Sequence, residues 1–289
     1  MSFSTLDFND PDFWSRVKVA TSGANIGKFK TSGGVRFVTL RDTAKMVPIV
    51  RTGEELWETT VRNAYGSKSY SVIINAQLYD VSKSGLMDAL LGSDPVPAGA
   101  TTPQGRSMMR GKTLAGVSAK QMFYIAYRDK ACPSYSFGFG AAPMNTTSAV
   151  GGGGPIIVNG RPYAGKNHYD PSAPNGAPVS GEPGPPYDKH LTYRGNLTYR
   201  SLSQKDGTVG KVIVAHSSKE SMLVIVVQPD SVVKRPLDDL RNHLEALKID
   251  NAIFFDGSDS AMMMVNGLFE VRAGSNKNET NITGIGFKY

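Results

Sequence analysis

The chain has 289 residues, of which 40 % are apolar and 20 % charged, so it can bury a sizeable core and lacks the composition of a disordered protein. Its formal net charge is +7, but Lys and Arg form no cluster or basic helix that would track a nucleic acid polymer. This positive excess is either modest and spread over the surface, or it attracts a small anionic substrate. The sequence contains no apolar run long enough for a membrane span and no secretory signal, which predicts a cytoplasmic protein unless it is exported by another route.

The N-terminal residues 1–34 are mixed and dotted with Gly and Ser, and we expect an arm with little regular structure. Residues 35–289 contain no linker between two apolar stretches, which predicts a single domain. The single Cys132 excludes an internal disulfide framework, and a lone Cys is usually a core residue.

Four segments of the first half predict regular structure. Residues 35–40, 70–78 and 122–128 are rich in β-forming side chains and indicate strands. Residues 54–64 carry acids at their start and place apolar side chains near one helical face, which favours a helix.

Residues 145–196 have the least regular composition. They include four consecutive glycines at 151–154 and a series of prolines at 171–186, which predicts a long loop insertion and a candidate lid, with the glycines as a flexible linker. A short apolar island at 155–158 is followed by Asn159-Gly160, a pair that signals a hairpin turn.

The C-terminal third shows the clearest pattern. Two apolar strands at 211–215 and 222–227 predict an antiparallel hairpin. Pro236 opens a helix with a Leu stripe, and further strands are expected at 252–255, 262–265 and 282–287, with a turn at Asn266-Gly267. The fold class is therefore α/β or α+β, with a mixed sheet, hairpin-linked strands and few helices.

The strand at 252–255 runs directly into Asp256-Gly257-Ser258-Asp259-Ser260. A strand end fixes the backbone, and small neighbours let a ligand approach the acid closely. Two carboxylates in one pocket are what glycoside hydrolysis requires. Two alternatives stay open on spacing alone: a solvated turn capped by its own Asp side chains, and a calcium-binding loop, although the full twelve-residue calcium pattern is absent.

The run from Phe254 to Gly267 resembles the signature of the phosphodiester glycosidase family, the family of N-acetylglucosamine-1-phosphodiester alpha-N-acetylglucosaminidase and its bacterial and phage relatives. Three further segments resemble family motifs in the expected order: the one around Asn75, the segment 154–160, and the strand that starts at Lys211. The chain departs from the family pattern where glycines are expected, at Ser258 and Asp259, and where an Arg is expected, at Lys211 unless Arg200 serves.

The resemblance implies hydrolysis of a sugar C1–O bond to phosphate in a small-molecule or glycan phosphodiester. It implies that Asp256 positions the sugar or activates water, that Asp259 assists, and that Lys211 or Arg200 stabilises the departing phosphate. The remaining candidate substrate-binding residues are Asn75, Gly257, Ser258, Ser260 and His216.

No His pair has metal-ligand spacing, and no cofactor is expected beyond the calcium alternative. Two functional alternatives remain: an exoglycosidase that acts on a non-phosphorylated glycan, and a carbohydrate- or nucleotide-binding protein without turnover. The oligomeric state is not predicted.

Overall fold

The computed structural model describes residues 2–77, 79–81, 101–103, 105–116, 123–140, 142–163, 209–233, 235–274, 278 and 280–289. The chain divides into two compact units. Unit 1 contains residues 1–42 and 154–258, and unit 2 contains residues 43–153 and 259–289. The boundary between them falls within one strand, β12 (Ser148–Val158), and again after Ser258.

Unit 1 is built on one sheet with the strand order β1-β2-β3-β15-β14-β16-β12. All neighbouring strands are antiparallel except β1 and β2. A short strand, β13, pairs with the end of β12. The strands are β1 (Ser4–Thr5), β2 (Ile26–Lys30), β3 (Arg36–Arg41), β13 (Arg161–Pro162), β14 (Lys211–Ser217), β15 (Met222–Gln228) and β16 (Asn251–Phe255).

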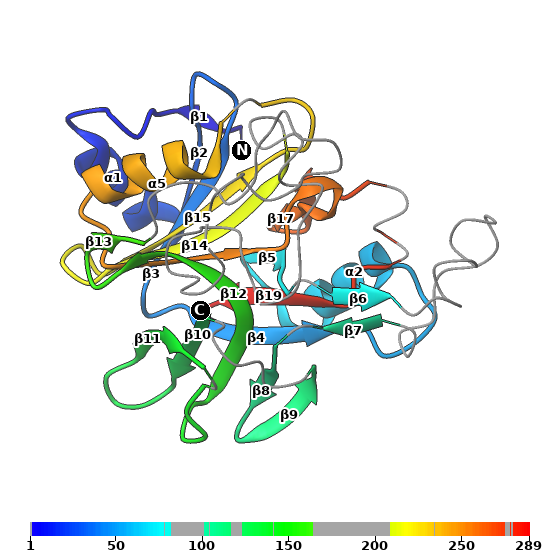
Figure 1. Ribbon diagram of the computed structural model, residues 1–289. Helices are drawn as coiled ribbons and strands as arrows, with labels where there is room; N and C mark the ends of the chain where they lie inside the picture. Colours follow the sequence, from blue (N-terminus) through cyan, green and yellow to red (C-terminus); the bar gives the residue numbers. More distant parts are fainter. Residues whose placement is uncertain are drawn as a thin grey trace, which may run out of the picture. The chain divides into compact units, whose positions relative to one another are not determined.

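Two helices, α1 (Phe13–Ala24) and α5 (Leu237–Ala246), lie side by side over one face of this sheet (Figure 1). The Leu stripe of α5 and the buried side chains of α1 share one apolar cluster with alternate residues of the strands. This cluster includes Phe13, Val17, Leu240, Ile213 and Phe254. The core of unit 1 therefore lies between these two helices and the sheet.

Unit 2 contains a five-stranded antiparallel sheet of order β18-β17-β5-β19-β4 and the helix α2 (Trp57–Lys68). The first part of β12 pairs with β10 and β8, and β6 pairs with β7. The strands are β4 (Lys45–Val50), β5 (Val72–Asn75), β6 (Tyr79–Val81), β7 (Thr101–Pro103), β8 (Ser107–Met109), β9 (Lys112–Ala115), β10 (Phe123–Arg128), β11 (Ser134–Phe139), β17 (Met263–Val265), β18 (Leu268–Val271) and β19 (Thr283–Lys288).

The predicted α+β class is confirmed, since the described ranges combine three α-helices with strands in mixed and antiparallel sheets. The predicted elements at 35–40, 54–64, 70–78, 122–128 and in the C-terminal third correspond to observed ones, with ends shifted by a few residues. Both predicted turns also form. Asn159-Gly160 closes the β12–β13 hairpin and Asn266-Gly267 closes the β17–β18 hairpin, each with positive φ at both residues.

The interpretation of residues 1–34 as an arm with little regular structure is wrong. Residues 13–24 form α1, which buries Phe13, Val17 and Thr21 along one face and ends at Asn25 in the left-handed conformation. Only two of these three side chains are bulky and apolar, so the helical pattern is weak in the sequence. The helix is stabilised mainly by its packing on the sheet.

The interpretation of residues 151–154 as a flexible linker is also wrong, because these glycines belong to the buried strand β12. Within unit 2, the Gly151 backbone N–H donates to Arg106 O at 2.9 Å. A Cβ at Gly105 would lie 2.4 Å from Gly152 Cα, so the two backbones approach more closely than side chains would allow. The remainder of the predicted loop insertion, from residue 164 onward, lies outside the described residues.

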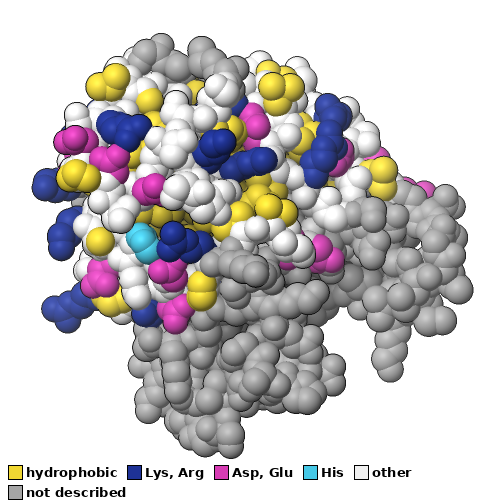
Figure 2. Space-filling model, turned by 90° about the horizontal axis from the view of Figure 1, so that it is seen from above, with side chains coloured by type: hydrophobic (Ala, Val, Ile, Leu, Met, Phe, Trp, Pro, Cys, Tyr) yellow, Lys and Arg dark blue, Asp and Glu magenta, His cyan; other side chains and the backbone are white. Residues whose placement is uncertain are grey.

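Cys132 is exposed, contrary to the expectation of a core residue. It lies in the turn between β10 and β11, where no side chain needs to be buried. None of the described helices has the length and apolar composition needed to cross a bilayer. On the described part of the face drawn in Figure 2, basic and acidic side chains are interspersed, which agrees with a charge excess that is spread over the surface.

Candidate functional site

The acid motif begins where β16 ends. β16 pairs with β14 in a register that places Val212 opposite Phe255 and Ile213 opposite Phe254. Continuing this register by one residue places Asp256 opposite Lys211. Residues directly opposite each other on antiparallel strands have Cβ atoms about 4.5–5.5 Å apart, so the acid and the basic residue are cross-strand neighbours.

The packing around Gly257 shows that the segment after β16 stays beside the start of β14 beyond Phe255, the last residue of the strand. A Cβ at Gly257 would lie 2.1 Å from Gly210 O and 3.3 Å from Lys211 Cα. Both are backbone atoms, which cannot rotate away. Glycine is therefore required at this position by close approach of the backbone, and it keeps the half-buried Asp256 beside the start of β14.

Lys211 is the first residue of β14, and it is completely buried. Its Nζ donates to Val209 O at 2.9 Å, and Gln228 Nε2 donates to the same carbonyl at 2.7 Å. Asp230 Oδ1 accepts a hydrogen bond from the Gly210 backbone N–H at 2.9 Å. Three polar side chains thus fix the chain at 209–211, which is the segment that contacts Gly257.

His216 lies at the other end of β14, opposite Asn251 at the start of β16. Five residues of extended strand separate Asn251 from Asp256, which is roughly 16 Å. His216 is 8 % exposed, and its Nε2 lies 3.4 Å from Asp42 Oδ2. The structure therefore brings Lys211 to Asp256, but it places His216 away from both.

From Asp259 onward the motif belongs to unit 2. The 3₁₀ helix at Ser258–Ser260 carries the half-buried Asp259 and the buried Ser260. Three contacts hold the backbone from Asp259 to Met262. Asn75 Oδ1 accepts from the Met262 N–H at 2.8 Å, Asn281 Nδ2 donates to Ser260 O at 3.4 Å, and the Gly274 N–H donates to Asp259 O at 2.7 Å.

Asn75 was predicted as a substrate-binding residue, and its side-chain oxygen has a structural partner. It stands at the end of β5, is 2 % exposed and anchors the chain that follows the acid motif. This makes Asn75 a positioning residue for the segment that bears Asp259. Asn281 and Gly274 share this task, and no spacing or motif in the sequence identifies them.

Arg200 lies outside the described residues, and so does the side chain of Ser258. Within the described ranges, no three or more His, Cys, Asp or Glu side chains are grouped so that they could hold a metal ion. The calcium alternative stays a prediction.

The model of the phosphodiester glycosidase family matches residues 68–287, which is well over half of the chain, and the chain belongs to this family. The matched range includes Asn75, Lys211, Asp256 and Asp259. No curated protein sequence matches the chain.

Among solved structures, the chain is similar to the catalytic domain of zebrafish N-acetylglucosamine-1-phosphodiester alpha-N-acetylglucosaminidase, auto-inhibited by its pro-peptide. The identity is 13 %, the TM-score is 0.53, and the match covers 91 % of this chain and 81 % of that one. A structure from Burkholderia pseudomallei matches with 12 % identity and a TM-score of 0.54 over 88 % of this chain and 74 % of that one. At these identities the likeness concerns the fold.

Proposed function

We propose that this protein hydrolyses the bond between C1 of a sugar and a phosphate oxygen in a sugar phosphodiester or a nucleotide-sugar-like substrate. The observation that carries the proposal is the cross-strand placement of Asp256 opposite the buried Lys211, with Gly257 against the Gly210 backbone. Membership of the phosphodiester glycosidase family supports the reaction type.

The chemistry fits this pair of side chains. A phosphate group is a good leaving group, so it needs less proton donation from a general acid than a sugar alcohol would need. What lowers the barrier is a cation held where negative charge develops, and an ammonium in a dry site is worth more than one in water. Lys211 supplies that cation in our proposal, as a point charge instead of the bidentate fork of an Arg.

Asp256 acts on the other side of the reaction. A carboxylate beside the anomeric carbon stabilises the oxocarbenium-like transition state or removes a proton from the attacking water. We assign to Asp259 an assisting role in that step. Ser260 is assigned to binding of sugar hydroxyls or phosphate oxygens. These roles are functional hypotheses that single substitutions test.

The test is turnover of Asp256→Asn on a panel of sugar 1-phosphodiesters and nucleotide sugars, with and without chelator. We expect hydrolysis to be abolished while the melting temperature stays nearly unchanged, since Asn has the same shape and can still hydrogen bond. Asp12→Asn is the matched control. Asp12 is exposed, precedes α1, and makes no side-chain capping hydrogen bond, so full activity is expected.

The panel also separates the other functions. Unchanged activity of Asp256→Asn would refute the proposal. Cleavage of a neutral aryl glycoside but not of any phosphodiester would indicate an ordinary exoglycosidase. Saturable binding without any product would indicate a binding protein.

A further inference from the structure

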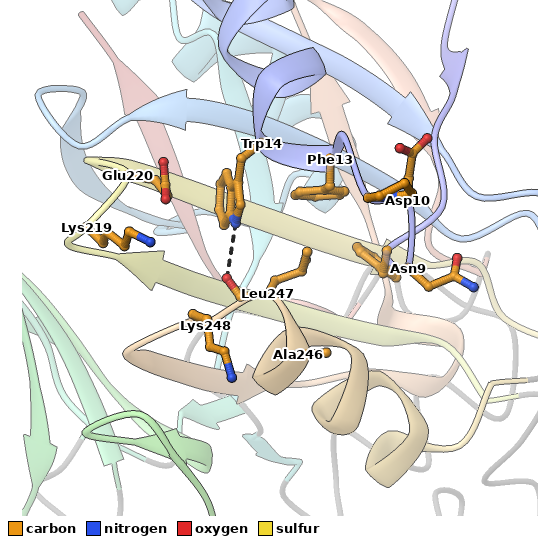
Figure 3. Close-up of a pocket in the computed structure, with 11 residues that line it drawn as sticks. Asn9, Asp10, Phe13, Trp14, Lys219, Glu220, Ala246, Leu247 and Lys248 are labelled. Carbon is orange, nitrogen blue, oxygen red and sulfur yellow. Dashed lines mark hydrogen bonds between the residues drawn. The ribbon is translucent and has the colours of Figure 1, made fainter.

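A concave site lies in unit 1, at the end of the sheet opposite the acid motif. It encloses about 400 Å³ between the start of α1, the turn that joins β14 to β15, and the chain that follows α5 (Figure 3). This volume is within the range typical of small-molecule sites, about 300–1,000 Å³.

One wall of this pocket is the indole of Trp14 (Figure 3). Its Nε1–H donates to Leu247 O at 3.1 Å, and its ring meets Phe13 edge-on, with centroids 5.2 Å apart. The indole N–H is therefore already satisfied and the ring is held in one orientation. A fixed, partly exposed aromatic wall with polar groups around it suits a ligand that has a flat apolar face and a polar edge, as a pyranose ring has.

The acidic and the basic side chains that line the pocket differ in whether they form ion pairs. Both acids of the lining are already paired with cations that do not line the pocket: Asp10 with Arg16 at 2.6 Å, and Glu220 with Lys18 at 2.6 Å.

The two basic side chains that line the pocket lack such partners among the described residues. Lys219 and Lys248 are exposed, and neither ammonium has an ion-pair or hydrogen-bond partner among the described residues. Figure 3 shows Lys219 extending from the hairpin turn toward Trp14, with Lys248 below Leu247. The pocket is therefore electropositive, and it offers donors to an anionic group beside its aromatic wall.

The strand register separates this pocket from the acid motif. Lys219 and Glu220 lie in the turn beyond the pair Ser217 and Met222, and Lys248 lies just before Asn251, where β16 starts. Asp256 follows the opposite end of β16, roughly 16 Å further along the strand direction. The same sheet thus carries the acid motif at one end and the Trp14 pocket at the other.

We propose that the Trp14 pocket is a second saccharide-binding site, which takes a phosphorylated sugar: the sugar ring packs on the indole, and Lys219 and Lys248 bind the phosphate. The choice of a phosphorylated sugar rests on the proposed function, since such a site would hold a further unit of a phosphate-bearing glycan while another unit is cleaved. The pocket itself, its wall and its charges do not depend on that function.

The experiment follows the indole N–H signals of the full chain labelled with ¹⁵N-tryptophan, in the Asp256→Asn background so that no ligand is consumed. The chain has two Trp residues, and Trp57 is completely buried in unit 2, so it serves as an internal reference. Trp14→Phe assigns the two signals. The probes are N-acetylglucosamine 1-phosphate, N-acetylglucosamine, inorganic phosphate and uridine monophosphate.

We expect N-acetylglucosamine 1-phosphate to shift the Trp14 signal saturably and to leave Trp57 unmoved. Lys219→Gln and Lys248→Gln should each weaken binding about tenfold, as is typical of a lost charge-assisted hydrogen bond. Lys30→Gln removes the same charge from an exposed residue of unit 1 outside the pocket and should leave the affinity unchanged.

Four results would overturn the proposal: an unmoved Trp14 signal, equal weakening by Lys30→Gln, equal affinity for inorganic phosphate or for the neutral sugar, or binding of the nucleotide alone. Because the readout is a signal at Trp14, binding there together with no phosphodiester hydrolysis by the parent chain, which carries Asp256, would refute the proposed function and leave this site standing.

Discussion

Replacement of Gly257 by Ala is the most direct perturbation of the site, because it adds one methyl group and changes no charge. The added Cβ would lie 2.1 Å from Gly210 O. Real Cβ atoms essentially never come closer than 3.0 Å to another heavy atom, so this contact would be about 0.9 Å too short. The partner is a backbone carbonyl, so the two chain segments must separate by roughly that distance.

The cost follows from the rigidity of the partner segment. Gly210 is held by Asp230, and its neighbours are held by Gln228 and by the strand pairing of Lys211. Overpacking a site of this kind typically costs about 1–3 kcal/mol. For a chain of this size that corresponds to a melting temperature lower by roughly 2–12 °C. A displacement of about 1 Å at reacting groups can reduce turnover about 10²-fold.

The assay is thermal unfolding together with hydrolysis of the best substrate from the phosphodiester panel. Gly66→Ala is the matched control: Gly66 lies in α2, and a Cβ there meets nothing within 4 Å. Ala is the better helix former by about 1 kcal/mol, so the control should melt slightly higher and keep full activity. A Gly257→Ala chain that melts and turns over like the parent would refute the close packing of the acid motif against the start of β14.

Three further substitutions test other parts of the structure. Asn75→Ala leaves the buried Met262 N–H without its acceptor and should lower the free energy of unfolding by about 1–3 kcal/mol; an unchanged denaturant midpoint would contradict the anchoring role. Lys211→Met should reduce turnover of a sugar phosphodiester about 10²-fold more than turnover of an aryl glycoside, and equal losses on both would remove Lys211 from phosphate stabilisation. Burial raises the pKa of Tyr70 to about 12 from 10.0, so its neutral form is favoured in the folded state. Its contribution to stability is complete below pH 10 and is lost as the pH rises toward 12. Tyr70→Phe should therefore show a smaller loss in alkaline unfolding scans, and an unchanged alkaline limb would refute this.

Much of the fold could be predicted from local pattern. Continuous apolar runs predicted β14, β15 and β16, and a Leu stripe after Pro236 predicted α5. Few local structures other than a buried strand or an amphipathic helix can bury apolar side chains in these patterns. The position of Asp256 at the end of a buried strand also followed from the sequence, and so did the family, since both depend on residues that are adjacent in the chain.

Long-range pairing decided what local pattern could not. The glycines at 151–154 have no side chain to indicate a strand, yet they lie in β12 because neighbouring strands satisfy their backbone. Gly105 packs directly against this strand, since a Cβ at Gly105 would lie 2.4 Å from Gly152 Cα. α1 shows only a weak apolar stripe and is stabilised by the sheet on which it packs.

The same division holds at the candidate site. The sequence predicted Asp256, Lys211 and Asn75 as site residues. Only the tertiary structure places Lys211 opposite Asp256. It also shows that the Asn75 oxygen accepts from the Met262 N–H and that His216 pairs with Asp42. Composition and periodicity determine which segments must be buried. Which side chains then meet depends on strand register and on contacts between residues that are far apart in the chain, and no local pattern encodes these.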